Sequence, residues 1–126
     1  MALVLIARAA SAATLESSTL SLQVTEAPYS FRVVERSTGE ILLRQSATTF
    51  TMAGSSAGAA SASAVVTTAT TLDADLTLGG AGTAHVRFTF TTPQVLKVAL
   101  TAMGSTQIQE QFEDQQEHVY GIWEYP

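Results

Sequence analysis

Apolar and polar residues alternate along most of the chain, and this pattern predicts β-strands. In residues 19–25, leucines and a valine occupy every second position, with hydroxyl and amide side chains between them. A period of two places successive side chains on opposite faces of a strand. The same alternation recurs in residues 29–34, 72–78, 86–90 and 96–101. We therefore predict about eight or nine short strands, each with one apolar face.

Turn residues separate these segments and define the expected architecture. Glycine, proline or serine occurs in residues 37–40, 79–82, 92–93 and 104–105, as is typical of turns between strands. No stretch of ten or more residues shows the 3.6-residue period of a helix. The sequence predicts one all-β domain over residues 1–126, an antiparallel β-sandwich. A closed barrel is the structural alternative.

Residues 53–64 interrupt the alternation because they contain only alanine, glycine and serine. Flexible linkers have this composition. We predict a flexible loop here, and we interpret it as a tolerated surface insertion in preference to a lid over a site.

Composition and charge exclude several classes of function. The chain of 126 residues has no cysteine, which excludes disulfides, thiolate metal sites and cysteine nucleophiles. Six basic and six acidic residues cancel up to Lys97, so the net charge of −5 lies entirely in the following acidic residues. Nucleic acids and anionic lipids require basic residues, and no segment reaches the roughly 18 apolar residues of a membrane span. The sequence predicts neither a nucleic-acid nor a membrane partner.

Two groups of ionisable residues are candidates for chemistry. Asp73 and Asp75 lie on the same face of a predicted strand, where a carboxylate pair could serve acid–base catalysis or bind calcium; we interpret them as solvated charges. His85 stands alone on a polar face and is also predicted to be solvated. A small complete enzyme using Asp73, Asp75 or His118 is the weakest of our hypotheses, since no nucleophile-elbow sequence accompanies these residues.

The second group lies near the end of the sequence and comprises Glu113, Asp114, Glu117 and His118. Their spacing matches no recognised metal motif, so we interpret this segment as a charged connector. Residues 79–82 are rich in glycine but lie between two predicted strands, whereas a phosphate-binding loop leads into a helix. We predict no catalytic residue, no metal site and no cofactor in this chain.

Three large aromatic rings, those of Tyr120, Trp123 and Tyr125, fall within six residues. Such rings would expose considerable apolar surface unless something covers them. They either close the core of the sandwich, or they dock on a further domain or face a sugar ring. The residues alone leave these explanations open.

Two groups of segments resemble a known family. Residues 28–35 (PYSFRVVE) with 39–42 (GEIL) resemble one hairpin of the galactose-mutarotase-like N-terminal β-sandwich of family 31 glycoside hydrolases. Residues 86–90 (VRFTF), 95–98 (VLKV), 111–112 (QF) and 114–124 (DQQEHVYGIWE) resemble the end of that sandwich. The resemblance covers residues 15–126, interrupted by 53–64. The chain departs from the family signature at Trp123, where the family has a second glycine.

The resemblance implies a part of a retaining α-glycosidase, of the α-glucosidase or α-xylosidase type. In that family both catalytic carboxylates lie on a (β/α) barrel, which requires about 250 residues. The expectation is therefore a non-catalytic N-terminal fragment of a longer enzyme that packs on the barrel and contributes to carbohydrate hydrolysis. Trp123, Glu124 and Tyr125 are the residues that the resemblance implies at the rim of the substrate pocket, where an oligosaccharide would bind.

A different class of function is the alternative to this expectation. The chain would then be a free-standing carbohydrate- or protein-binding sandwich, with Tyr120, Trp123 and Tyr125 as its binding platform. The sequence does not indicate a compartment or a substrate linkage.

Overall fold

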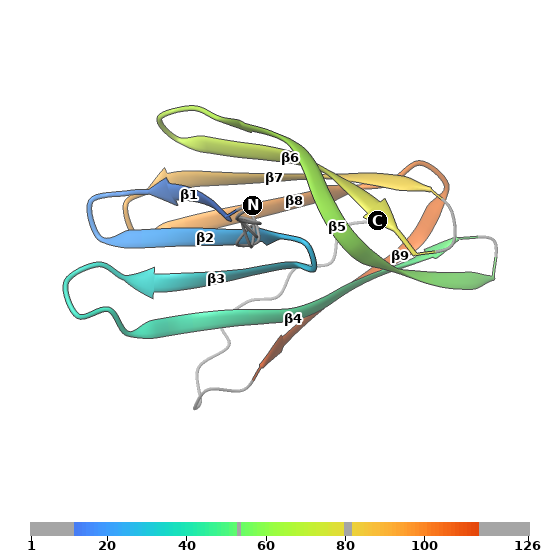
Figure 1. Cartoon of the computed structure of the whole chain (residues 1–126), viewed down its shortest axis with the longest axis horizontal. Helices are drawn as coiled ribbons and strands as arrows, with labels where there is room; N and C mark the ends of the chain where they lie inside the picture. Colours follow the sequence, from blue (N-terminus) through green and yellow to red (C-terminus); the bar gives the residue numbers. More distant parts are fainter. Residues whose placement is uncertain (1–11, 53, 80–81, 114–126) are drawn as a thin grey trace, which may run out of the picture.

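Antiparallel strands make up most of the structure, a computed structural model that describes residues 12–52, 54–79 and 82–113 (Figure 1). The strands are β1 (Ala12–Glu16), β2 (Leu20–Glu26), β3 (Tyr29–Glu35), β4 (Ile41–Met52), β5 (Ser55–Thr67), β6 (Thr71–Leu78), β7 (Thr83–Thr92), β8 (Val95–Thr101) and β9 (Ser105–Glu113). The predicted all-β, antiparallel class is confirmed. Among the described residues there is no helix of a length and apolarity suited to crossing a membrane.

The strands form two sheets that share β5. Strands β1 to β8 neighbour one another in chain order, and β9 returns to pair with β4. The first residues of β5 pair with the second half of β4, and its later residues pair with β6. Strands β1, β8 and β9 each have only one paired neighbour within the described ranges. The sheet therefore stays open, and the closed-barrel alternative is wrong.

The core lies between the two sheets and follows the predicted alternation. In β6, Leu72 and Leu76 are fully buried and face inward, while Asp73 and Asp75 lie on the outer face. The rings of Phe31 in β3 and Phe88 in β7 meet edge to face, with centroids 5.0 Å apart. Removing such a buried ring typically costs about 3–5 kcal/mol. This contact joins β3, one of the strands that carry the site described below, to the other sheet.

The prediction of a flexible loop at residues 53–64 is wrong over 55–64, because these residues belong to β5. The first residues of this segment pair with β4 and the later ones pair with β6. The pairing with β6 contains register shifts. Their small side chains suit this path, since Ala62 is buried in the core and Gly79 N–H donates to Gly58 C=O over 2.8 Å. Figure 1 shows β5 crossing obliquely from one sheet to the other. The linker-like composition thus belongs to a strand that passes close to its neighbours.

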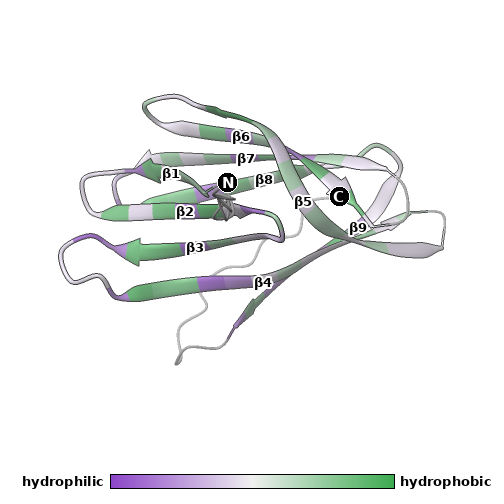
Figure 2. Cartoon of the chain, viewed as in Figure 1, coloured by the Kyte–Doolittle hydropathy of each residue, from purple (hydrophilic) through white to green (hydrophobic). Residues whose placement is uncertain are grey.

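Burial is less complete on the side of the sandwich formed by β8 and β9. Their apolar side chains Leu96, Val98, Leu100, Ile108 and Phe112 pack against the core but are only partly buried. β8 pairs with β7 and β9 pairs with β4. Figure 2 also shows a hydrophilic stretch in β4, following its apolar first residues. β4 contributes Arg44 and Gln45 to the candidate site.

Candidate functional site

The residues predicted at a pocket rim lie beyond the part of the chain that the structure describes. Trp123, Glu124 and Tyr125 are in this group, as are Tyr120 and His118. Of the predicted acidic connector, the structure describes only Glu113, the last residue of β9. The role of residues 123–125 therefore stays a prediction.

Strand β4 brings together the two groups of segments singled out in the sequence. Arg44 of β4 pairs with Arg32 of β3 on one edge and with Glu113 of β9 on the other. The rings of Phe31 and Phe112, each from one of those groups, meet edge to face with centroids 6.2 Å apart. Segments far apart in the sequence thus form one corner of the sandwich.

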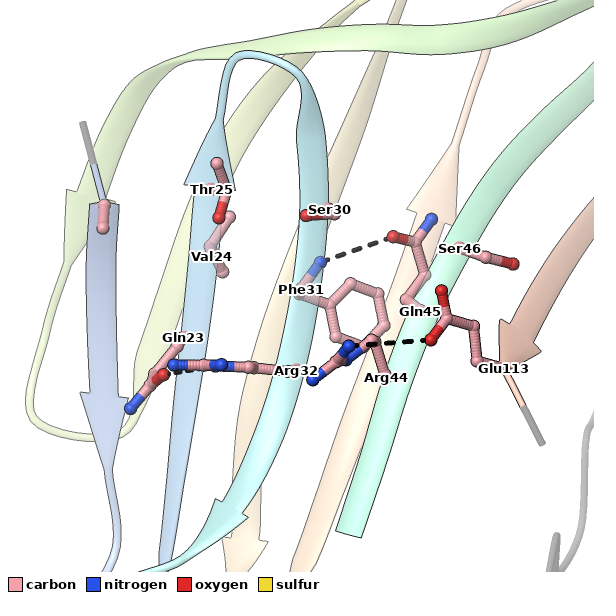
Figure 3. A pocket seen from close by; sticks show the side chains of 11 residues that line it. Gln23, Val24, Thr25, Ser30, Phe31, Arg32, Arg44, Gln45, Ser46 and Glu113 are labelled. Carbon is pink, nitrogen blue, oxygen red and sulfur yellow. Dashed lines mark hydrogen bonds and ion pairs between the residues drawn. The ribbon is translucent and has the colours of Figure 1, made fainter. Parts of the chain in front are cut away.

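A chain of polar side chains runs through this corner where β3 and β4 diverge. The paired register of the two strands stops at Arg32 and Arg44. Beyond it, the side chain of Gln45, only 2% exposed, accepts the Phe31 backbone N–H through Oε1 at 3.3 Å (Figure 3). Gln45 Nε2 donates to Thr48 Oγ1 at 3.0 Å, and Thr48 donates to Glu110 Oε1 at 2.5 Å. We call Gln45, Thr48 and Glu110 the buried polar chain; it links β3, β4 and β9.

The carboxylate of Glu110 is the electrostatically unusual member of this chain. Burial raises its pKa to about 6, and the hydrogen bond from Thr48 only partly offsets this effect. Its second oxygen, Oε2, is buried and has no hydrogen-bond partner among the described residues, and the same holds for the hydroxyl of Tyr29. Burial, with the charge of Glu110 as a smaller cause, raises the pKa of Tyr29 far above its ordinary value. A buried carboxylate of this kind holds a proton near neutral pH more readily than an exposed one.

An open cavity of about 460 Å³ lies beside the buried polar chain. Its lining comes from β1 to β4 and the end of β9, and most of the residues that line it are polar. Figure 3 shows Gln23, Arg32, Arg44 and Glu113 across its floor. The lining residues are Ala12, Gln23, Val24, Thr25, Ser30, Phe31, Arg32, Arg44, Gln45, Ser46 and Glu113.

A second polar cluster lies on the outer face of the other sheet, on β6 and β7. His85 lies between the two carboxylates, with Nε2 2.9 Å from Asp73 Oδ1 and Nδ1 3.2 Å from Asp75 Oδ1. Arg87 Nε donates to the same Asp73 oxygen at 2.8 Å. The shared face of Asp73 and Asp75 is confirmed, but the prediction that His85 stands alone is wrong. Cross-strand pairing of Asp75 with His85 and of Asp73 with Arg87 explains the cluster.

Electrostatics in this exposed cluster follow from its opposite charges. The hydrogen bond from Arg87 is the main cause that lowers the pKa of Asp73, and the hydrogen bond to Asp73 is the main cause that raises the pKa of His85. These groups satisfy one another, and within the described residues no group of three or more His, Cys, Asp or Glu side chains is arranged to hold a metal ion. We therefore interpret the cluster on β6 and β7 as a network of surface ion pairs.

Sequence reasoning missed the buried polar chain, although a signal for it was present. Glu110 shares the inward face of β9 with Ile108 and Phe112, and Gln45 shares that of β4 with Phe50. A polar residue at a strand position where the alternation predicts an apolar one indicates either a buried hydrogen-bond network or an irregular strand. Here both apply, because the β4–β9 register shifts between Gln45 and Ala47.

No protein-family model, curated protein or solved structure matches this chain. The case for a function therefore rests on the residues and their geometry.

Proposed function

We propose that this chain is the non-catalytic N-terminal β-sandwich of a family-31-like retaining α-glycosidase. In this proposal it packs on a catalytic (β/α) barrel, and Trp123, Glu124 and Tyr125 contribute to the rim of the substrate pocket. The observation that carries the proposal is the meeting of Phe31 and Phe112 on either side of β4. Each phenylalanine belongs to one of the two motif groups that resemble the family.

The arrangement of the two motif groups supports this assignment. The first group spans the β3–β4 hairpin, and the second includes β7, β8 and the end of β9. A chance likeness of two short motifs gives no reason for them to be neighbours in space, whereas one shared fold does. The apolar residues of β8 and β9 pack against the core but stay partly exposed, and a further domain could cover the part that remains exposed.

The described acidic residues also suit a non-catalytic role. Retaining glycosidases use two carboxyl groups about 5–5.5 Å apart that flank the scissile bond. Asp73 is held by His85 and Arg87, and Glu110 is enclosed in the buried polar chain. In the proposal, the barrel supplies both catalytic carboxylates.

The test starts from the gene. We expect the reading frame to continue beyond codon 126 with alternating strand and helix patterns. Its full product should hydrolyse aryl α-glucosides or α-xylosides with retention of configuration. NMR of the first anomer released measures that stereochemical outcome. Residues 1–126 alone should be inactive. Trp123→Ala in the full product should raise KM about tenfold for the loss of an aromatic contact worth about 1.4 kcal/mol. A downstream sequence without that alternation would refute the proposal.

Fluorescence distinguishes the free-standing binding module from this proposal. The module predicts saturable quenching of Trp123 in residues 1–126 by an oligosaccharide, with no need for a second domain. We expect no response from the isolated chain, because a pocket rim without its pocket offers few contacts. Saturable quenching together with a reading frame that ends at codon 126 would favour the module.

A further inference from the structure

The floor of the cavity is a row of polar side chains aligned across four strands. Gln23 of β2 pairs with Arg32 of β3, Arg32 pairs with Arg44 of β4, and Arg44 pairs with Glu113 of β9. Directly paired residues project from the same face of a sheet. Figure 3 shows the four side chains side by side on that face. We call these four residues the arginine row.

Two cations occupy the centre of this row with little compensation. Like charges directly opposite one another on neighbouring strands are destabilising. Arg32 Nε donates to the neutral amide oxygen of Gln23 at 2.6 Å. Among the described residues, Arg44 forms an ion pair with Glu113, but the separation of 3.8 Å is long and the side chains are 39% and 50% exposed. The guanidinium groups therefore retain donors that face solvent in the cavity.

The shape of the site follows from the divergence of β3 and β4. Because the strands separate beyond the arginine pair, the outer face of the sheet is hollowed there. Ser30 and Ser46 add hydroxyl groups to the lining on the two sides of the gap. The buried amide of Gln45 accepts the Phe31 N–H and so links β4 to β3 across the gap. The donors are thus carried by paired strands and not by a loop.

The chemistry of the lining selects the class of ligand. Phe31 is the single aromatic residue of the lining, and its ring is buried in the core at 2% exposure. The lining therefore offers no free ring face against which a sugar could stack. Guanidinium groups instead match the planar geometry of a carboxylate, which they bind through two parallel hydrogen bonds.

We propose that the arginine row is a carboxylate-binding site, at which Arg32 and Arg44 bind one carboxylate between them while Gln23 and Glu113 hold their side chains apart. The carboxylate comes either from a small organic acid or from an acidic side chain of a protein partner. This site is independent of the glycosidase proposal, because it uses neither the barrel nor residues 123–125.

The binding test follows the Nε–Hε signals of the arginines by NMR in the 126-residue chain. Succinate represents a free organic acid, and a hexaglutamate peptide represents acidic side chains. We expect at least one probe to shift the Arg32 and Arg44 signals saturably, while sodium chloride of equal ionic strength does not. The probe that binds identifies the source of the carboxylate. If neither probe binds saturably, or if glucose binds there instead, the proposal is wrong.

Matched variants separate specific binding from general charge. Arg32→Gln and Arg44→Gln should each weaken binding about tenfold or more, as expected for loss of a charge-assisted hydrogen bond. Arg87→Gln removes the same charge from the other sheet and should leave binding unchanged. An equal loss in the Arg87 variant would overturn the assignment. Because the signals of the unaltered protein already locate the site, a variant that fails to fold does not prevent the test.

Discussion

The buried polar chain and the exposed cluster on β6 and β7 contain similar chemical groups but behave in opposite ways. In the exposed cluster, Asp73 contacts the guanidinium group of Arg87 and the imidazole ring of His85, and the hydrogen bond from Arg87 is the main cause that lowers its pKa. In the buried polar chain, Glu110 has a hydroxyl partner and, within the described part of the chain, no cationic one, and burial raises its pKa to about 6. Surroundings, more than residue type, decide which protonation state each carboxyl group favours.

The comparison also separates two structural roles. Surface ion pairs typically contribute between nothing and about 1 kcal/mol, since water and salt screen them. Breaking a buried hydrogen bond costs more stability, because the polar group that remains has neither its protein partner nor water to bond with. The buried polar chain joins three strands at the point where β3 and β4 separate, so the geometry of that corner depends on it.

Breaking the buried polar chain should have the largest effect. Gln45→Ala removes the partner of the Phe31 N–H and of Thr48 and leaves a cavity, so we expect a loss of about 3 kcal/mol in the free energy of unfolding. Urea denaturation provides the measurement. Gln23→Ala, which removes a partly buried glutamine from the outer face of the same sheet, is the matched control and should cost much less. Equal losses in the two variants would show that Gln45 is not structurally special.

Neutralising Glu110 should have the next largest effect, and it should depend on pH. The folded-state pKa of about 6 lies above the ordinary value of 4.5. The unaltered protein therefore loses about 2 kcal/mol of stability as the pH rises through this window, because the charged form is disfavoured in the fold. Glu110→Gln should abolish that decline and be the more stable protein at pH 7. Parallel stability curves for the two proteins between pH 4 and 7 would contradict this.

Disrupting the exposed cluster should have the smallest effect. Asp73→Asn should cost less than about 1 kcal/mol at pH 5.5. The pKa of His85 is raised in the folded protein. The stability that protonated His85 contributes is therefore fully present below the ordinary pKa of 6.5, and it is lost as the pH rises through the folded-state pKa. NMR titration should show the pKa of His85 falling in Asp73→Asn, and falling less in Asp75→Asn. An unchanged pKa in both variants would show that the contacts do not persist in solution.

Most of the fold could be predicted because alternation reports burial directly. In β6 and β7 every inward position is apolar, and the predicted faces match the buried residues. In β5, alanine and serine differ too little in hydropathy to reveal a face, so backbone pairing alone reveals the strand. Hydrogen bonds to neighbouring strands are not visible in the composition of a single segment.

The candidate site was harder to predict because it depends on pairings between distant strands. Arg32, Arg44 and Glu113 are unremarkable at their separate places in the sequence, and the cross-strand register alone aligns them. Gln45 and Glu110 each break an apolar pattern, but nothing local shows that Thr48 joins them. The pairing of Asp73 and Asp75 with residues of β7 could have been predicted from the sequence. Two neighbouring strands were predicted there, each with polar residues on one face.

The order of the strands has a consequence for how the corner forms during folding. Strands β1 to β8 each find a partner next to them in the chain, whereas β9 pairs with β4 across the four intervening strands. Closing so long a loop costs more entropy than closing a hairpin, and non-local pairings slow folding. We expect β9 to gain protection from hydrogen exchange last, as pulse labelling during refolding would show. The arginine row and the buried polar chain would then be absent from early folding intermediates and would report on completion of the native fold.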